Sequence, residues 1–332
     1  MAFLRSELEP TVTLQESETL GLEAAERCRE AFKTHGVFLI RCPGRAWTPA
    51  TLLSFLLAHF EELDWGKDYL GGANPRLELG AHVYDVGVPD CADVLHHHEM
   101  QYKQATVRSL AFACAHAFSE PDKVVPTELG DAKAAARYLK SHAPALRRRL
   151  STEGVIYVRA LSDKSRELEA EQYLYNHWQA SFRTEKPEEA ESRATAAGLE
   201  IQWTSTERAG TVLETQFRAA TFEKAEDGEE VLFATPADSE EWFRTWPGFE
   251  NLTPEDSPMR MSYGGGAPIL DEERRLWWEA VRAETYDVKW ETGDVLVVCN
   301  FRWSHGRKTP RFGSAGRSLL LALGGTAARS RS

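Results

Sequence analysis

The run His96-His97-His98-Glu99 contains the residue types of a metal site. In an extended segment, residues i and i+2 point to the same face, so we expect His97 and Glu99 to share one face of a strand. His96 and His98 would then face the other way. His305, far along the chain in the segment RWSHGR, is the best candidate for a third ligand. Two histidines and one carboxylate on one side of an octahedron leave three positions open, as in non-haem Fe(II) oxygenases.

The same three side chains also suit zinc, and clustered histidines on a strand are often structural. A second feature favours an iron oxygenase over a zinc site or a structural role. Arg317 follows His305 closely and begins the apolar run RSLLLAL. A guanidinium that points inward from this position can hold a carboxylate through two parallel hydrogen bonds.

Hydrophobic patterning predicts the elements that must position these residues. Buried strands are expected where short apolar runs occur, and helices where apolar residues recur every three or four positions. Asp131 is a good helix N-cap, and Gly293-Asp294 is a turn before a strand. The expected strands are 37–40, 109–117, 154–161, 295–298 and 317–325, and the expected helices are 21–34, 48–63, 131–150, 187–197 and 271–284.

Composition limits the possible function classes. The chain has 332 residues, with 39 basic and 51 acidic side chains and a net charge of −12, which disfavours nucleic acid as the main partner. The sequence contains no stretch of roughly 20 apolar residues, so no membrane span is predicted. Five cysteines without a CxxC pair indicate free thiols and a cytoplasmic location. No G-x-G-x-x-G or Walker A motif supports a nucleotide fold.

Six segments occur in the order and spacing of one known family, and together they resemble the taurine dioxygenase-like family of Fe(II)/2-oxoglutarate oxygenases. The similarity is greatest to the branch that acts in amino-acid and natural-product metabolism. The resemblance implies iron ligands at His97, Glu99 and His305, and 2-oxoglutarate contacts at Thr127 and Arg317. It also implies a mainly β fold, a double-stranded β-helix or jelly-roll core with peripheral helices. The segments are FKTHGVFLIRCPG, HHHEMQY, PTELGDAKAAARYL, MSYGGGAPI, GDVLVVCN and HGRKTPRFGSAGR.

The implied reaction uses Fe(II), 2-oxoglutarate and O2 and releases succinate and CO2. It oxidises an unactivated C–H bond of a small amino-acid-like substrate, free or attached to a carrier protein, by hydroxylation, desaturation or cyclisation. Glu99 disfavours halogenation, because related halogenases have a small residue there. Leu321 stands where taurine enzymes have a second arginine, which disfavours a sulfonate substrate. The alternatives are a zinc hydrolase with the same triad, which would not need Arg317, and a non-catalytic metal-binding jelly roll.

We expect one oxygenase domain over residues 1–332, with residues 162–250 as an insert or lid within it. Trp178, Trp203 and Phe217 in this insert are candidate aromatic side chains of the substrate pocket, although packing in the core is the more common role for each. Tyr69 and Arg76 lie in a glycine-rich loop before the metal motif and are candidates to reach a substrate carboxylate.

Overall fold

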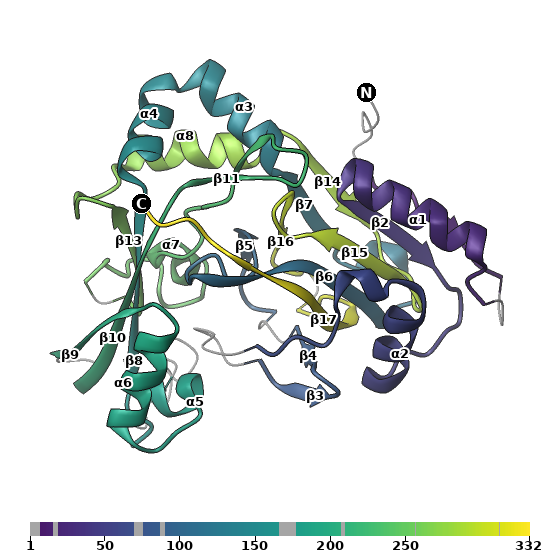
Figure 1. Cartoon of the computed structure of the whole chain (residues 1–332), viewed down its shortest axis with the longest axis horizontal. Coiled ribbons are helices and arrows are strands. Elements are labelled where there is room, and N and C mark those ends of the chain that lie inside the picture. Colours follow the sequence, from purple (N-terminus) through teal and green to yellow (C-terminus); the bar gives the residue numbers. More distant parts are fainter. Residues whose placement is uncertain are drawn as a thin grey trace.

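Two β-sheets form the core of the chain in the computed structural model, and further strands and peripheral helices surround them (Figure 1). The structure describes residues 7–15, 19–69, 76–86, 90–165, 177–206, 210–255, 257–311 and 313–332. The larger sheet has seven strands, in the order β1 (Val12–Thr13), β2 (Val37–Arg41), β15 (Val295–Cys299), β6 (Ala105–Ala117), β17 (Arg317–Ala328), β4 (Val83–Asp85) and β3 (Glu78–Gly80). The smaller sheet has four, in the order β14 (Thr285–Val288), β7 (Thr127–Asp131), β16 (Trp303–Arg307) and β5 (Val94–His97).

An apolar core joins these two sheets. Leu110 and Phe112 of β6 and Leu321 of β17 belong to the same buried cluster as Leu129 of β7 and Trp303 of β16. Side chains on alternate positions of each strand therefore meet between the sheets, as expected when two sheets pack face to face. This arrangement confirms the predicted mainly β, jelly-roll fold class.

The middle of the chain contributes most of the strands outside the two core sheets. They form a second four-stranded sheet and a two-stranded ribbon. The four-stranded sheet has the order β13 (Met259–Tyr263), β8 (Val155–Ser162), β10 (Gly210–Ala219) and β9 (Glu200–Thr206), and the ribbon pairs β11 (Phe222–Lys224) with β12 (Glu230–Leu232).

Helices cover the sheets from three sides (Figure 1). The first two pack on the seven-stranded sheet through a separate apolar cluster that includes Cys28, Leu52 and Phe60. The helices are α1 (Leu22–His35), α2 (Pro49–His59), α3 (Ala132–His142), α4 (Pro144–Glu153), α5 (Trp178–Phe182), α6 (Pro187–Ala196), α7 (Glu240–Arg244) and α8 (Asp271–Val281), with 3-10 turns η1 (Glu61–Leu63) and η2 (Pro121–Lys123).

The helix expected over 131–150 is in fact two helices. Asp131 is the N-cap of α3, since its carboxylate accepts the backbone N–H groups of Lys133 at 2.8 Å and Ala134 at 3.2 Å. Pro144 has no N–H to continue the helical hydrogen bonds, so α3 ends and α4 begins there.

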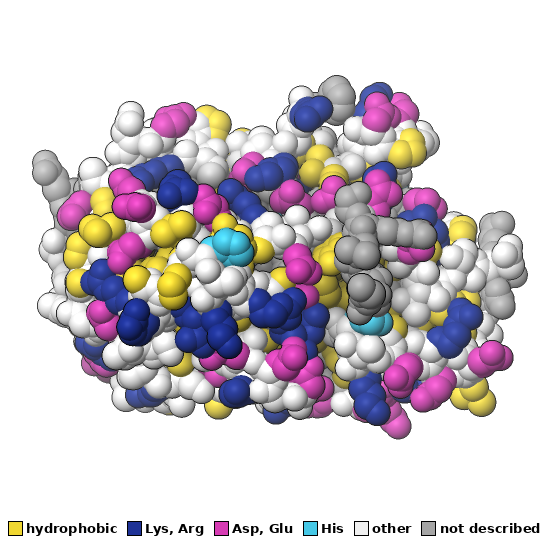
Figure 2. All heavy atoms as spheres, turned by 90° about the horizontal axis from the view of Figure 1, so that it is seen from above, with side chains coloured by type: hydrophobic (Ala, Val, Ile, Leu, Met, Phe, Trp, Pro, Cys, Tyr) yellow, Lys and Arg dark blue, Asp and Glu magenta, His cyan; other side chains and the backbone are white. Residues whose placement is uncertain are grey.

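Basic and acidic side chains both lie on the face of the molecule seen from above in Figure 2. No described helix is both long and apolar enough to cross a membrane.

Arg329, a buried residue just after β17, contacts three other parts of the chain. Its guanidinium donates to the carbonyl oxygens of Gln101 and of Ala220, the latter at 2.6 Å, and lies 4.7 Å above the ring of Phe233. It also forms an ion pair with Glu223 at 3.6 Å. Arg329→Ala should lower the free energy of unfolding by roughly 3 kcal/mol, because it leaves the buried carboxylate of Glu223 without its cationic partner and two carbonyl groups without this donor.

Urea unfolding followed by tryptophan fluorescence measures this loss. Arg331 is the matched control, because it is exposed and, among the described residues, bonds to Gln104 and to the carbonyl of Gly198. Arg331→Ala should change the unfolding free energy by less than about 0.5 kcal/mol. Equal losses in the two variants would show that the burial of Arg329 contributes nothing.

Candidate metal centre and cosubstrate site

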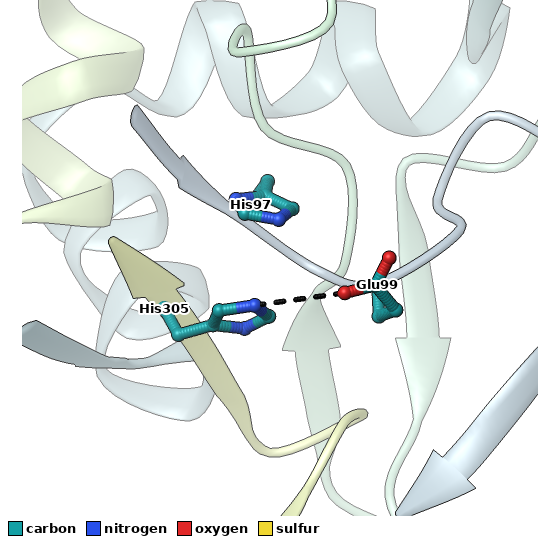
Figure 3. A group of neighbouring side chains, drawn as sticks. All are labelled: His97, Glu99 and His305. Carbon is teal, nitrogen blue, oxygen red and sulfur yellow. Dashed lines mark ion pairs between the residues drawn. The ribbon is translucent and has the colours of Figure 1, made fainter. Parts of the chain in front are cut away.

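The structure brings together the three predicted metal ligands, His97, Glu99 and His305 (Figure 3). One ligand atom from each side chain lies within 4.8 Å of the others. His97 ends β5, and His305 stands directly opposite it on the antiparallel strand β16, with ring centroids 4.4 Å apart. Glu99 completes the group from the segment that follows β5. The register of one strand pair therefore places both imidazoles.

The local backbone at Glu99 differs from the expected strand. β5 ends at His97, and Glu99 lies in a turn that continues through Met100, whose φ is +59°. Fully buried Asn300 holds this turn: its side-chain oxygen accepts the N–H of Glu99 at 2.8 Å, and its amide donates to the carbonyl of Glu99 at 3.0 Å. The hydroxyl of Thr106 donates to the same carbonyl at 2.7 Å. A side-chain clamp, and not strand alternation, thus aims the carboxylate.

The donor atoms fit a divalent cation such as Fe(II). Nδ1 of His97 lies 2.9 Å from the carbonyl oxygen of Leu95, which can only accept, so Nδ1 carries the proton and Nε2 keeps its lone pair. Burial lowers the pKa of His305 well below its ordinary value, and the neighbouring His97 lowers it further, so this ring is neutral. Its Nε2 is 3.8 Å from the carboxylate of Glu99. Two neutral imidazoles and a carboxylate are the donor set of the facial triad.

The other two histidines of the run point away, as expected, and both pack within the protein. The ring of His98 stacks on Phe233 at 4.5 Å, and its Nδ1 bonds to the carbonyl of Asn300 at 2.5 Å. Burial lowers the pKa of His98 to about 3, so it is neutral and structural. His96 lies 3.6 Å from Glu128 of β7, the strand on the far side of β16.

The predicted cosubstrate residues Thr127 and Arg317 line the same cavity of about 430 Å³ as the three metal-site residues. Arg317, at the start of β17, donates to the carbonyl oxygens of Val125 at 2.6 Å and Pro126 at 3.4 Å. Trp290 links the pair: its ring lies 5.7 Å below the guanidinium, and its N–H donates to the hydroxyl of Thr127 at 3.0 Å. No local pattern marks Trp290 for this role, because it contacts Arg317 and Thr127 only in the folded chain.

Arg317 is a partly buried cation suited to a ligand carboxylate. Burial and, to a smaller extent, nearby Arg307 lower its pKa to about 9, so the group stays cationic at neutral pH. Within the part of the chain that the structure describes, no carboxylate lies within ion-pair distance of it, whereas Arg307 has Asp90 at 3.7 Å. Binding of an anion to a desolvated guanidinium of this kind is favourable, because it supplies the partner that water no longer provides.

Trp290→Phe should weaken 2-oxoglutarate binding while keeping the fold. The variant keeps an aromatic ring below Arg317 but loses the hydrogen bond that orients Thr127. One hydrogen bond contributes about 0.5–1.5 kcal/mol, so the KM for 2-oxoglutarate should rise about 2- to 13-fold. Trp47→Phe is the control, since Trp47 donates to Gly293 away from the cavity. A similar rise in KM in both variants would contradict this role.

The cavity lining also contains residues that the sequence did not all reveal. Tyr69 and Arg76 line the cavity, as the sequence allowed. Trp178, Trp203 and Phe217 pack in apolar clusters and do not line it, so each has the core role that is more common for such aromatic residues. Lining residues that the sequence did not mark include Tyr102, Asp238, Trp242 and Met259.

Comparisons with known proteins identify the family of the chain. The family model of the taurine catabolism dioxygenase TauD, TfdA family matches residues 4–323. A clavaminate synthase-like protein of Arabidopsis thaliana is 24% identical over 254 residues, covering 75% of this chain and 70% of the relative. The dapdiamide synthesis protein DdaC of Enterobacter agglomerans is 29% identical over 147 residues, covering 40% of each chain. A crystal structure described as an alpha-ketoglutarate-dependent taurine dioxygenase from Burkholderia xenovorans has a TM-score of 0.50 at 16% identity and covers 98% of both chains.

The structural likeness supports the fold, and the family match supports the chemistry. The match includes every residue of the candidate site, from Arg76 to Arg317. It confirms the predicted enzyme class and the predicted cofactors, Fe(II), 2-oxoglutarate and O2. The chain therefore belongs to the taurine catabolism dioxygenase TauD, TfdA family and is a non-haem Fe(II)/2-oxoglutarate-dependent dioxygenase.

Proposed function

We propose that His97, Glu99 and His305 hold Fe(II), and that Thr127 and Arg317 hold 2-oxoglutarate. The substrate is a small amino-acid-like molecule, free or attached to a carrier protein, and an unactivated C–H bond of it is oxidised by hydroxylation, desaturation or cyclisation. One observation carries the proposal: the three ligand atoms lie within 4.8 Å of one another on a cavity that also contains an arginine without a carboxylate partner among the described residues.

Each side chain has a physical task in this proposal. Bound Fe(II), with 2-oxoglutarate and O2, supplies the oxidising chemistry, and succinate and CO2 leave. Arg317 would pair with the distal carboxylate of the cosubstrate, and Thr127, oriented by Trp290, would hydrogen-bond to it. Burial of Glu99 and His305 keeps water away from the ligand atoms. The carboxylate of Glu99 fills the position that a halogenase leaves open.

The substrate class is supported by the relatives and by one substitution. A relative is named for dapdiamide synthesis, which favours a role in natural-product biosynthesis. Leu321, fully buried within β17, cannot hold a sulfonate. We further propose one domain over residues 1–332 with 162–250 as its insert or lid, supported by Asp238 and Trp242 on the cavity wall. Five free cysteines favour the cytoplasm.

Anaerobic addition of Fe(II) and 2-oxoglutarate tests the site. A weak visible charge-transfer band should appear with the natural chain, and 2-oxoglutarate should be converted to succinate in air. A zinc hydrolase would show neither the band nor a need for 2-oxoglutarate. A non-catalytic metal-binding protein would bind iron but consume no oxygen with a broad panel of amino acids. Failure of the band to form with the natural chain would refute the cosubstrate site.

A further inference from the structure

Arg76 is a second cation in the cavity, and its task is not explained by iron or cosubstrate binding. Its guanidinium lies 2.9 Å from the carboxylate of Glu99, and only 14% of its side chain is exposed. It lines the cavity together with His97, Glu99 and His305. The charge of Arg76 therefore lies immediately beside the proposed iron position.

The ring of Tyr69 packs against the guanidinium of Arg76 and holds it in place. The guanidinium carbon lies 5.4 Å from the ring centre of Tyr69, a distance typical of a cation–π contact. Tyr69 is itself buried: its hydroxyl lies 3.2 Å from that of Tyr102, and its backbone N–H donates to the hydroxyl of Tyr84 at 3.0 Å. A side chain held in this way is preorganised to bind a ligand with little loss of entropy.

The charge balance at Arg76 changes when the metal site is filled. Glu99 is the only carboxylate of the described residues within ion-pair distance of Arg76. A divalent cation at the three ligands draws on the same carboxylate, so Arg76 is left with a weaker counter-ion. Its Nε atom is also buried without a hydrogen-bond partner among the described residues. A buried cation in this state favours a second anion.

The other cations of the cavity are already paired or assigned. Arg307 is paired with Asp90, and Arg317 is the proposed cosubstrate anchor. Asp238, which also lines the cavity, is paired with buried Arg159. The lining includes apolar side chains as well, among them Leu77, Met100, Trp242 and Met259.

From this geometry we propose that Arg76 binds a free carboxylate of the substrate and sets specificity for it. The inference rests on the proposed function and deepens it. A substrate bound through its carboxylate to Arg76 is a free acid with an apolar body. A carboxyl group tied to a carrier protein as a thioester carries no charge and cannot make this contact.

The test uses binding without turnover. The full chain is loaded with Mn(II) and N-oxalylglycine, an unreactive analogue of 2-oxoglutarate, and titrated with hexanoate, hexanamide, L-norleucine and L-norleucinamide. Trp242 lines the cavity, so quenching of tryptophan fluorescence reports binding. In the natural chain each acid should bind at least about 10-fold more tightly than its amide, as expected for a charge-assisted contact. Arg76→Gln should reduce this ratio to about 1, and Arg76→Lys should keep part of it.

Arg183→Gln is the matched control, because Arg183 pairs with Asp68 outside the cavity, and it should keep the full ratio. The proposal is overturned if no acid binds, if acids and amides bind equally, or if the preference survives in Arg76→Gln. Loss of Mn(II) binding in Arg76→Gln would instead make Arg76 a positioning residue for Glu99. A natural chain that forms no Fe(II)–2-oxoglutarate band refutes the proposed function, whereas a normal band without acid preference refutes only the anchor.

Discussion

Glu99→Ala should abolish 2-oxoglutarate turnover. The substitution removes the only carboxylate among the three proposed ligands and leaves two neutral imidazoles for a divalent cation. Even partners outside the ligand set of a metal site typically contribute 10- to 100-fold to affinity or activity, so loss of a ligand should lower turnover by at least about 100-fold. Succinate formation measures the turnover, and isothermal titration with Mn(II) measures the metal affinity.

The variant also removes the partner of Arg76, so a control must separate charge from ligation. Glu128 is suitable, because it too is an acidic residue paired with a neighbouring side chain, His96, but it does not line the cavity. Glu128→Ala should keep turnover within about twofold of the natural chain, as for a partly exposed site away from the chemistry. Near-normal turnover in Glu99→Ala, with Mn(II) still bound, would refute the triad.

Arg317→Ala should raise the KM for 2-oxoglutarate strongly while metal affinity stays unchanged. Loss of one partner of a buried charge pair costs about 2–5 kcal/mol, which corresponds to roughly 30- to several-thousand-fold. The large effect follows from the burial of Arg317, whose nearest acceptors among the described residues are the neutral carbonyls of Val125 and Pro126. Initial rates over a range of 2-oxoglutarate concentrations measure it.

Arg317→Lys tests whether charge alone suffices. Lysine keeps the positive charge but not the planar pair of N–H donors, so it should recover only part of the binding. Mn(II) binding, followed by titration, serves as the check that the three ligands remain intact. If the KM in Arg317→Ala stays within threefold of its natural value, the cosubstrate is held elsewhere.

Much of the fold follows from local patterns. The expected helix 21–34 corresponds to α1 (Leu22–His35), and the expected strand 317–325 is the first part of β17 (Arg317–Ala328). These two predictions are correct because hydrophobic periodicity reflects which face of a helix or strand is buried. The expected helix 131–150 fails as one unit because Pro144 divides it. The pairing of β5 with β16 is not visible in local sequence.

The proposed ligands of the candidate site could be predicted from the sequence, but the residues that position them could not. His97, Glu99 and His305 stand out by residue type and by resemblance, although a turn clamped by Asn300 places Glu99 and strand alternation does not. Trp290 and Asn300 carry no chemistry that marks them in one sequence. Their contacts arise only when segments distant in the chain meet, so no local pattern can reveal them.

The order of strands in the sheets also bears on when the enzyme can acquire its metal. β16 lies between β7 and β5, and β17 lies between β6 and β4, so strands made late in synthesis fill interior positions in both sheets. A nascent chain that has not yet released β16 and β17 from the ribosome has unpaired edges on β6 and β7. Such edges favour aggregation and engage chaperones. His305 reaches His97 only when β16 docks, so the proposed iron site can form only after β16 has left the ribosome.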